Sequence, residues 1–135
     1  MFQLLVLMLS WHQPLELVAE GMASYYTVES SGKITASGEP LNDGAFTCAM
    51  KNVPMGTYCL VVAENGSSIL CRVNDRGPHV KGRVIDLTEA AMRQLHADAD
   101  TLKVKVYRVK APDLSALLAK ADPPPTPKRM RAKSS

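Results

Sequence analysis

Alternating apolar and polar residues dominate the middle of the chain, and this pattern predicts β-strands. Strands are expected over residues 22–30, 57–63, 67–75, 82–87 and 101–109. Asn65 and Gly66 separate the second and third of these strands, and this dipeptide is a strong hairpin signal. Turn-forming residues crowd the segment 30–44. The pattern therefore predicts a mainly β domain.

One segment departs from the strand pattern and predicts a helix. Residues 88–99 are rich in alanine, and apolar side chains recur every four residues at Leu87, Ala91 and Leu95. Thr88 is a candidate N-cap, and Asp86 with Glu89 also has the spacing of a capping box. A single short helix is therefore expected before the last strand.

The two ends of the chain differ from the middle. Residues 1–20 begin with an apolar run at 2–9 that is too short to span a bilayer. The run resembles the core of a secretory signal without its basic start, and the alternative is an apolar arm packed on the domain. Residues 111–122 predict a short helix, and residues 123–135 predict a disordered, basic, proline-rich tail. One domain is expected over residues 21–110.

Composition and charge narrow the class of protein. Hydrophobic residues make up 46% of the chain but aromatic residues only 5%, which favours a core of aliphatic side chains. The formal net charge is +3, and basic residues gather at the C-terminal end. Because the remaining charge is nearly balanced, no nucleic-acid-binding face is predicted.

The cysteines, Cys48, Cys59 and Cys71, are odd in number. They form one disulfide with a thiol left over, or they are three small buried apolar residues. A two-residue hairpin loop would set Cys59 opposite Arg72, whereas a three-residue loop with a bulge would set it opposite Cys71. Their spacing does not suggest zinc ligands, and no metal or cofactor is predicted.

Four segments of the chain together resemble the rare lipoprotein A family. They are "GMASYY", "TASGEPLND", "FTCAMKNVPMGTYCLV" and "CRVNDRGPHVKGRVIDLTEAAMRQL", in the family's order and with similar spacing over residues 21–109. The resemblance implies a six-stranded double-psi β-barrel. It also implies a lytic transglycosylase that acts on peptidoglycan glycan strands lacking stem peptides. Expansins share this barrel, so the alternative is a non-catalytic, wall-loosening or glycan-binding module.

The resemblance also implies site residues. Asp75 matches the family's acid, Glu39 matches a glutamate implicated in activity, and Asp86 resembles an aspartate of expansin-like barrels. The family has a histidine where this chain has Met50, and methionine cannot transfer a proton. This departure weakens the implied catalysis but not the implied fold.

Such a reaction needs a single carboxyl group. In a lytic transglycosylase the C6 hydroxyl of N-acetylmuramic acid attacks its own anomeric carbon and forms a 1,6-anhydro ring. The same carboxyl group can protonate the departing glycosidic oxygen and then accept the C6 hydroxyl proton, whereas ordinary glycosidases use two carboxylates. The implied substrate is the bond between N-acetylmuramic acid and N-acetylglucosamine.

The residues themselves leave structural alternatives open. Asp75 also suits a turn aspartate that hydrogen-bonds its own backbone. Arg76 is expected to contact substrate or a structural carbonyl, and Thr35 to bond a sugar, a carboxylate or a turn. Neighbouring Tyr25 and Tyr26 point to opposite sides of a strand, so one could stack on sugar while the other packs inside.

The start of the chain bears on localisation. A possible cleavage follows Ala19, although Leu17 is larger than the usual residue at its position. No cysteine closely follows the apolar run, so a lipoprotein is not predicted. An exported protein of the periplasm or cell wall is expected, with peptidoglycan glycan strands as its partner and no stable membrane span.

Overall fold

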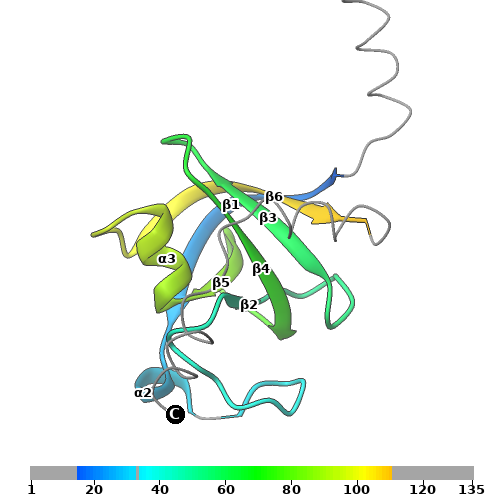
Figure 1. Cartoon of the computed structure of the whole chain (residues 1–135), viewed down its shortest axis with the longest axis vertical. Helices are drawn as coiled ribbons and strands as arrows, with labels where there is room; N and C mark the ends of the chain where they lie inside the picture. The colour runs from blue at the N-terminus through cyan, green and yellow to red at the C-terminus, as the bar shows by residue number, and fades with distance from the viewer. Residues whose placement is uncertain (1–14, 33, 111–135) are drawn as a thin grey trace, which may run out of the picture.

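The computed structural model describes residues 15–32 and 34–110, and these form a closed six-stranded barrel (Figure 1). Its elements are β1 (Leu15–Tyr26), α2 (Val28–Ser31), β2 (Thr47–Ala49), β3 (Tyr58–Ala63), β4 (Ser68–Asp75), β5 (Arg83–Thr88), α3 (Glu89–Leu95) and β6 (Thr101–Val109). Around the barrel the strand order is β1-β5-β2-β4-β3-β6, and β6 pairs again with β1. The pairs β1–β5 and β2–β4 are parallel, and the others are antiparallel. Closure leaves the sheet with no free edge.

Aliphatic side chains and cysteines fill the barrel. Strand β3 alternates between half-buried and buried positions, as a strand with one face on the core must. The inward side chains that are fully buried include Val61, Val73, Ile85, Leu87 and Val106. Helix α3 covers one side of the barrel and adds Met92 and Leu95 to this core (Figure 1). Burial of these apolar side chains is the main stabilising contribution to the fold.

Close approach of two strands explains one glycine. A Cβ on Gly21 would lie 2.8 Å from Val84 Cγ1 and 3.2 Å from the Gly82 carbonyl oxygen. The Met22 amide donates to that same carbonyl at 3.1 Å. Only glycine leaves room for the start of β5 to reach β1 here.

The predicted mainly β barrel with a helix before the last strand is confirmed, but several bounds differ. Strand β1 starts at Leu15, well before residue 22, because residues 15–20 pair with β6. Cleavage after Ala19 would therefore remove the first part of this strand. Strand β1 ends at Tyr26, so the strand predicted over residues 22–30 is wrong at its end: Thr27 caps the single-turn helix α2, which begins at Val28. The short strand β2 had no periodic signal. The predictions for residues 1–14 and 111–135 lie outside the described residues.

The β3–β4 hairpin settles the loop length. The Ala63 amide donates to the Ser67 carbonyl at 2.8 Å, and Gly66 has a φ of +92°, so the loop has three residues. Cys59 therefore lies opposite Cys71. All three cysteines are free and buried, and Cys71 Sγ lies 3.3 Å from Cys48 Sγ. Burial raises the pKa of the Cys59 thiol to about 12, so it stays protonated at neutral pH.

Of the two N-caps expected for helix α3, Thr88 and Asp86, the structure has Thr88. Its N-cap is Thr88, whose hydroxyl accepts a hydrogen bond from the Ala91 amide. Asp86 lies inside strand β5, so the prediction that Asp86 caps the helix is wrong. Pairing of residues 83–88 with β1 delays the start of the helix. Asp86 is thereby left available for other contacts.

Candidate active site

A loop between β1 and β2 docks on the end of β4 and forms the candidate site. In Figure 1 the segment between these strands projects below the barrel. Residues Ile34 and Pro40 form an isolated bridge that closes this loop. The Ser37 amide donates to the Asn74 carbonyl at 3.1 Å, and the Ala36 amide donates to Asp75 Oδ1 at 2.8 Å. The loop that carries Glu39 is thus fastened to the strand that carries Asp75.

Asp75 is half-buried at the end of β4 and accepts hydrogen bonds from three groups. Its Oδ1 accepts from the backbone amides of Ala36 and Arg76, each at 2.8 Å. Its Oδ2 accepts from the Tyr26 hydroxyl at 2.9 Å. The bond from Arg76 comes from the next residue of the chain, whereas those from Ala36 and Tyr26 come from distant segments. Neither ion pair found among the described residues includes Asp75.

Tyr26 is held as a proton donor beside this carboxyl group. Burial, together with the hydrogen bond to Asp75, raises the pKa of the Tyr26 hydroxyl above its ordinary value of 10.0. The hydroxyl therefore stays protonated through the physiological range. Its proton points at Asp75 Oδ2.

Glu39 has a different environment. Its Oε1 accepts from Asn74 Nδ2 and from Arg72 Nη1, each at 3.0 Å. The hydrogen bond from Asn74 and that from Arg72 lower the pKa of the Glu39 carboxyl below its ordinary value of 4.5. Its side chain is 45% exposed. Glu39 is therefore an ionised, paired carboxylate at neutral pH and is unsuited to donate a proton.

Asp86 lies on the strand next to β2 and is joined to β1. Its Oδ1 accepts from Ser24 Oγ at 2.5 Å. Ala49 of β2 is paired with Asp86 on one side and with Asp75 on the other. The two aspartates therefore flank one small, buried residue. Alanine at this place leaves the space between them free of a long side chain.

Three other residues expected at the site lie in structural contacts. Arg76 donates from Nη1 to the Met50 carbonyl at 3.1 Å, which is the structural carbonyl that was one of its two predicted partners. Thr35 donates to the Glu39 carbonyl at 2.8 Å and shapes the turn. Arg93 of α3 covers the Tyr25 ring, with its guanidinium carbon 4.8 Å from the ring centroid. Tyr25 and Tyr26 diverge as neighbours on a strand must.

Met50 contributes its backbone to the site and its side chain to the core. Its amide donates to the Asp75 carbonyl at 3.1 Å, and its carbonyl holds Arg76. Its Sδ lies 3.9 Å from Cys59 Sγ, and only 4% of the residue is exposed. The Met50 side chain, at the position where the resemblance implies a histidine, therefore packs in the barrel interior.

Sequence reasoning missed four residues that organise the site, namely Ser24, Tyr26 as a partner of Asp75, Arg72 and Asn74. Tyr26 and Ser24 share a face of β1 because they are two residues apart, and Arg72 and Asn74 share a face of β4 for the same reason. That spacing was visible in the sequence. The pairing of each face with a particular carboxylate was not.

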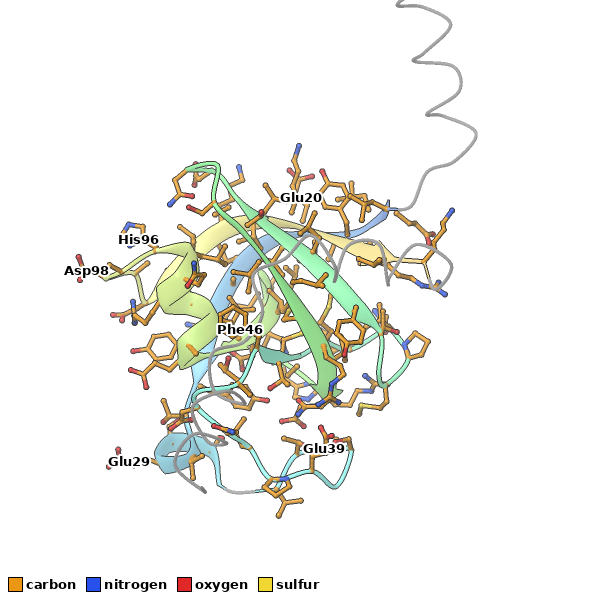
Figure 2. All side chains as sticks on the ribbon, viewed as in Figure 1. Glu20, Glu29, Glu39, Phe46, His96 and Asp98 are labelled. Carbon is orange, nitrogen blue, oxygen red and sulfur yellow. The ribbon has the colours of Figure 1, made fainter. Side chains whose placement is uncertain are left out.

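The described residues hold no metal-ligating cluster, and one hollow lies away from the candidate site. Among residues 15–32 and 34–110, no three histidine, cysteine, aspartate or glutamate side chains are grouped to bind a metal ion. A hollow of about 360 Å³ is lined by charged residues that include Glu20. Figure 2 shows Glu20 and Glu39 at opposite ends of the molecule in this view, so this hollow is separate from the candidate site.

A closed, mixed six-stranded barrel with acidic residues at one end is the architecture of the double-psi β-barrel class. An expansin of Clavibacter michiganensis, in its apo crystal structure, superposes with a TM-score of 0.54 at 22% identity, covering 69% of this chain and 50% of the expansin. At this identity the likeness concerns the fold alone.

Residues 18–109 match the family described as "Lytic transglycolase", and the chain belongs to this family. The Endolytic peptidoglycan transglycosylase RlpA of Pasteurella multocida is 44% identical over 77 residues, covering 56% of this chain and 26% of that protein. The protein of the same name from Yersinia pestis is 44% identical over 95 residues, covering 69% of this chain and 26% of its own length. This chain thus spans about a quarter of the length of both relatives.

Proposed function

We propose that this chain is a peptidoglycan lytic transglycosylase with Asp75 as its acid and base. One observation carries the proposal: Asp75 is half-buried, pairs with no cation among the described residues, and has the uncharged Tyr26 hydroxyl 2.9 Å from its Oδ2. Membership of the lytic transglycolase family and the names of the relatives support the reaction class.

The reaction is an intramolecular displacement on one sugar. Asp75 gives its proton to the glycosidic oxygen that leaves with N-acetylglucosamine. The C6 hydroxyl oxygen of N-acetylmuramic acid bonds to the anomeric carbon, and Asp75 takes up the hydroxyl proton. The carboxyl group is thereby returned to its starting form, and a 1,6-anhydro end is produced without water. General acid–base catalysis of this kind contributes about 10²–10⁴-fold to a rate.

The other carboxylates support this step rather than perform it. Glu39 is ionised and fastened by Arg72 and Asn74, so it holds the loop that donates the Ala36 amide to Asp75. Asp86, anchored to Ser24, lies across Ala49 from Asp75 and is proposed to contact the sugar. The site acts on the periplasmic or cell-wall side, where its substrate lies.

The test is incubation of the purified chain with glycan strands stripped of stem peptides, followed by mass spectrometry of the products. Ends that carry 1,6-anhydro-N-acetylmuramic acid are expected with the natural chain and not with Asp75→Asn. Binding of the strands without any anhydro product would reject the enzyme and favour the alternative, a non-catalytic glycan-binding module. Met50 favours this alternative, because methionine cannot transfer a proton and the resemblance implies a histidine at its position.

A further inference from the structure

A row of apolar side chains crosses the outer wall of the barrel. It consists of Leu17 on β1, Tyr107 on β6, Leu60 on β3 and Leu70 on β4, and we name it the outer apolar row. Tyr107 is paired with both Leu17 and Leu60, and Leu60 is paired with Leu70. Residues directly opposite each other on neighbouring strands share a face of the sheet, so the row is continuous.

The row points away from the core. The neighbours of its members along each strand, such as Val61 and Val106, are fully buried inside the barrel. Leu17 is 51% exposed, and the other three members are half-buried. A continuous apolar stripe on the outside of a barrel whose core is already filled marks a surface that something covers.

Charged residues border the row on one side. The hollow of about 360 Å³ lies there and is lined by Glu20, Glu64, Lys103 and Lys105 together with Val62. Lys105 pairs with Val62, the residue two positions beyond Leu60. An apolar centre with a charged rim has the anatomy of a docking surface for another element.

We propose that residues 111–122 of this same chain form a helix that docks on the outer apolar row. The chain leaves β6 at Val109, two residues after Tyr107, so this segment starts beside the row. The segment carries three leucines, Leu114, Leu117 and Leu118, and Ala121 follows Leu118 by three residues. Spacing of three, four and seven residues sets all of them on one face of a helix and leaves Lys120 on the other side.

The lengths of helix and row match. Nine helical residues, 113–121, are about 13 Å long at 1.5 Å per residue. The row crosses three gaps between strands, which is about 14 Å at 4.8 Å per gap. A helix of this length is marginal in water by itself, so it needs such a surface to form.

The other occupants suit the surface less well. The apolar run at residues 2–9 has Gln3 as its one polar residue, so it has no continuous polar side to turn toward water. Residues 111–122 are tethered next to the row, so their effective concentration there is high.

Truncation tests the proposal in the chain as it exists. We expect the chain ending at residue 110 to melt about 5–10 °C below the full chain and to bind more of an apolar fluorescent dye, because the row loses its cover. The chain ending at residue 122 is the matched control and should melt like the full chain. Equal melting of all three chains would overturn the proposal.

Two further outcomes identify a different occupant. A lower melting temperature on removal of residues 1–14, with no effect of residues 111–122, would assign the row to the N-terminal run. A full chain that is dimeric, and becomes monomeric on Leu60→Asp, would assign it to a second copy. Either result would reject docking of residues 111–122.

Point substitutions keep the test decisive if the shortened chain does not fold. Leu118→Asp places a charge on the docking face, whereas Ala116→Asp places the same charge on the opposite face. Only Leu118→Asp should lower the melting temperature of the full chain and remove nuclear Overhauser contacts between the segment and the Tyr107 ring. The proposal fails if both variants behave alike or if those contacts are absent from the natural chain.

Discussion

The carboxylates of Glu39 and Asp75 lie at the same end of the barrel but differ in the charge of their hydrogen-bond partners. Glu39 accepts from the Arg72 guanidinium and the Asn74 amide, whereas Asp75 accepts from one phenol and two backbone amides, all neutral. The cation beside Glu39 stabilises its ionised form, so Glu39 holds the loop in place and does not donate a proton. The comparison shows that the two carboxylates differ in the charge of their partners, and the proposed roles rest on that difference.

The largest effect is expected from replacing Asp75. Asp75→Asn should lower the rate of anhydro-product formation by about 10²–10⁴-fold, because the amide cannot donate and recover a carboxyl proton. Asp75→Ala should lose as much activity and also about 2–4 kcal/mol of unfolding free energy, because three donors lose their acceptor. Product rates and urea unfolding measure the two quantities. Full activity of Asp75→Asn would remove the distinction between the carboxylates.

Tyr26→Phe is expected to have the next largest effect. Loss of the hydrogen bond to Oδ2 should lower activity about 10-fold and stability by about 1–2 kcal/mol. The folded pKa of Tyr26 is raised above 10.0, so its contribution is complete below pH 10 and is lost as the pH rises beyond that value.

Urea unfolding from neutral to alkaline pH measures this contribution. The difference in stability between the natural chain and Tyr26→Phe should therefore shrink above pH 10. A constant difference across that range would show that the phenol titrates normally.

Met50→His tests whether the side chain at residue 50 reaches the site, at the position where the resemblance implies a histidine. Because this side chain packs against Cys59 in the core, the imidazole should lower stability by about 1–3 kcal/mol without raising activity. Met50→Leu, which conserves volume, should cost less than about 1.5 kcal/mol. Thermal unfolding and the product assay measure both variants. A gain in activity with Met50→His would mean that the side chain at this position reaches the site.

Glu39→Gln is expected to have the smallest effect. The ion pair is partly exposed, so its loss should lower stability by about 0.5–1 kcal/mol and activity only a few-fold. The folded pKa of Glu39 is lowered, so its contribution is present above pH 4.5 and is lost as the pH falls below that value. Unfolding at pH 7 should therefore separate the two chains more than unfolding at pH 3. Loss of activity comparable to that of Asp75→Asn would make Glu39 the reacting carboxylate.

Much of the fold was readable from local patterns. The alternation in β3, β4 and β6 and the four-residue spacing in α3 each predicted the right element. The short strand β2 escaped because three residues carry no measurable period. The early start of β1 escaped because residues 15–20 become a strand through pairing with β6. Six strands in one barrel came from the family resemblance rather than from the pattern.

The sequence by itself determined the strands, the helix, the hairpin and the identity of the carboxylates, because each depends on the period or type of residues close together in the chain. Only the tertiary structure decided which carboxylate is tied to a cation. Arg72 and Glu39 are separated by 33 positions, and Tyr26 and Asp75 by 49. Contacts across such separations exist only after the barrel closes, so no local pattern can encode them.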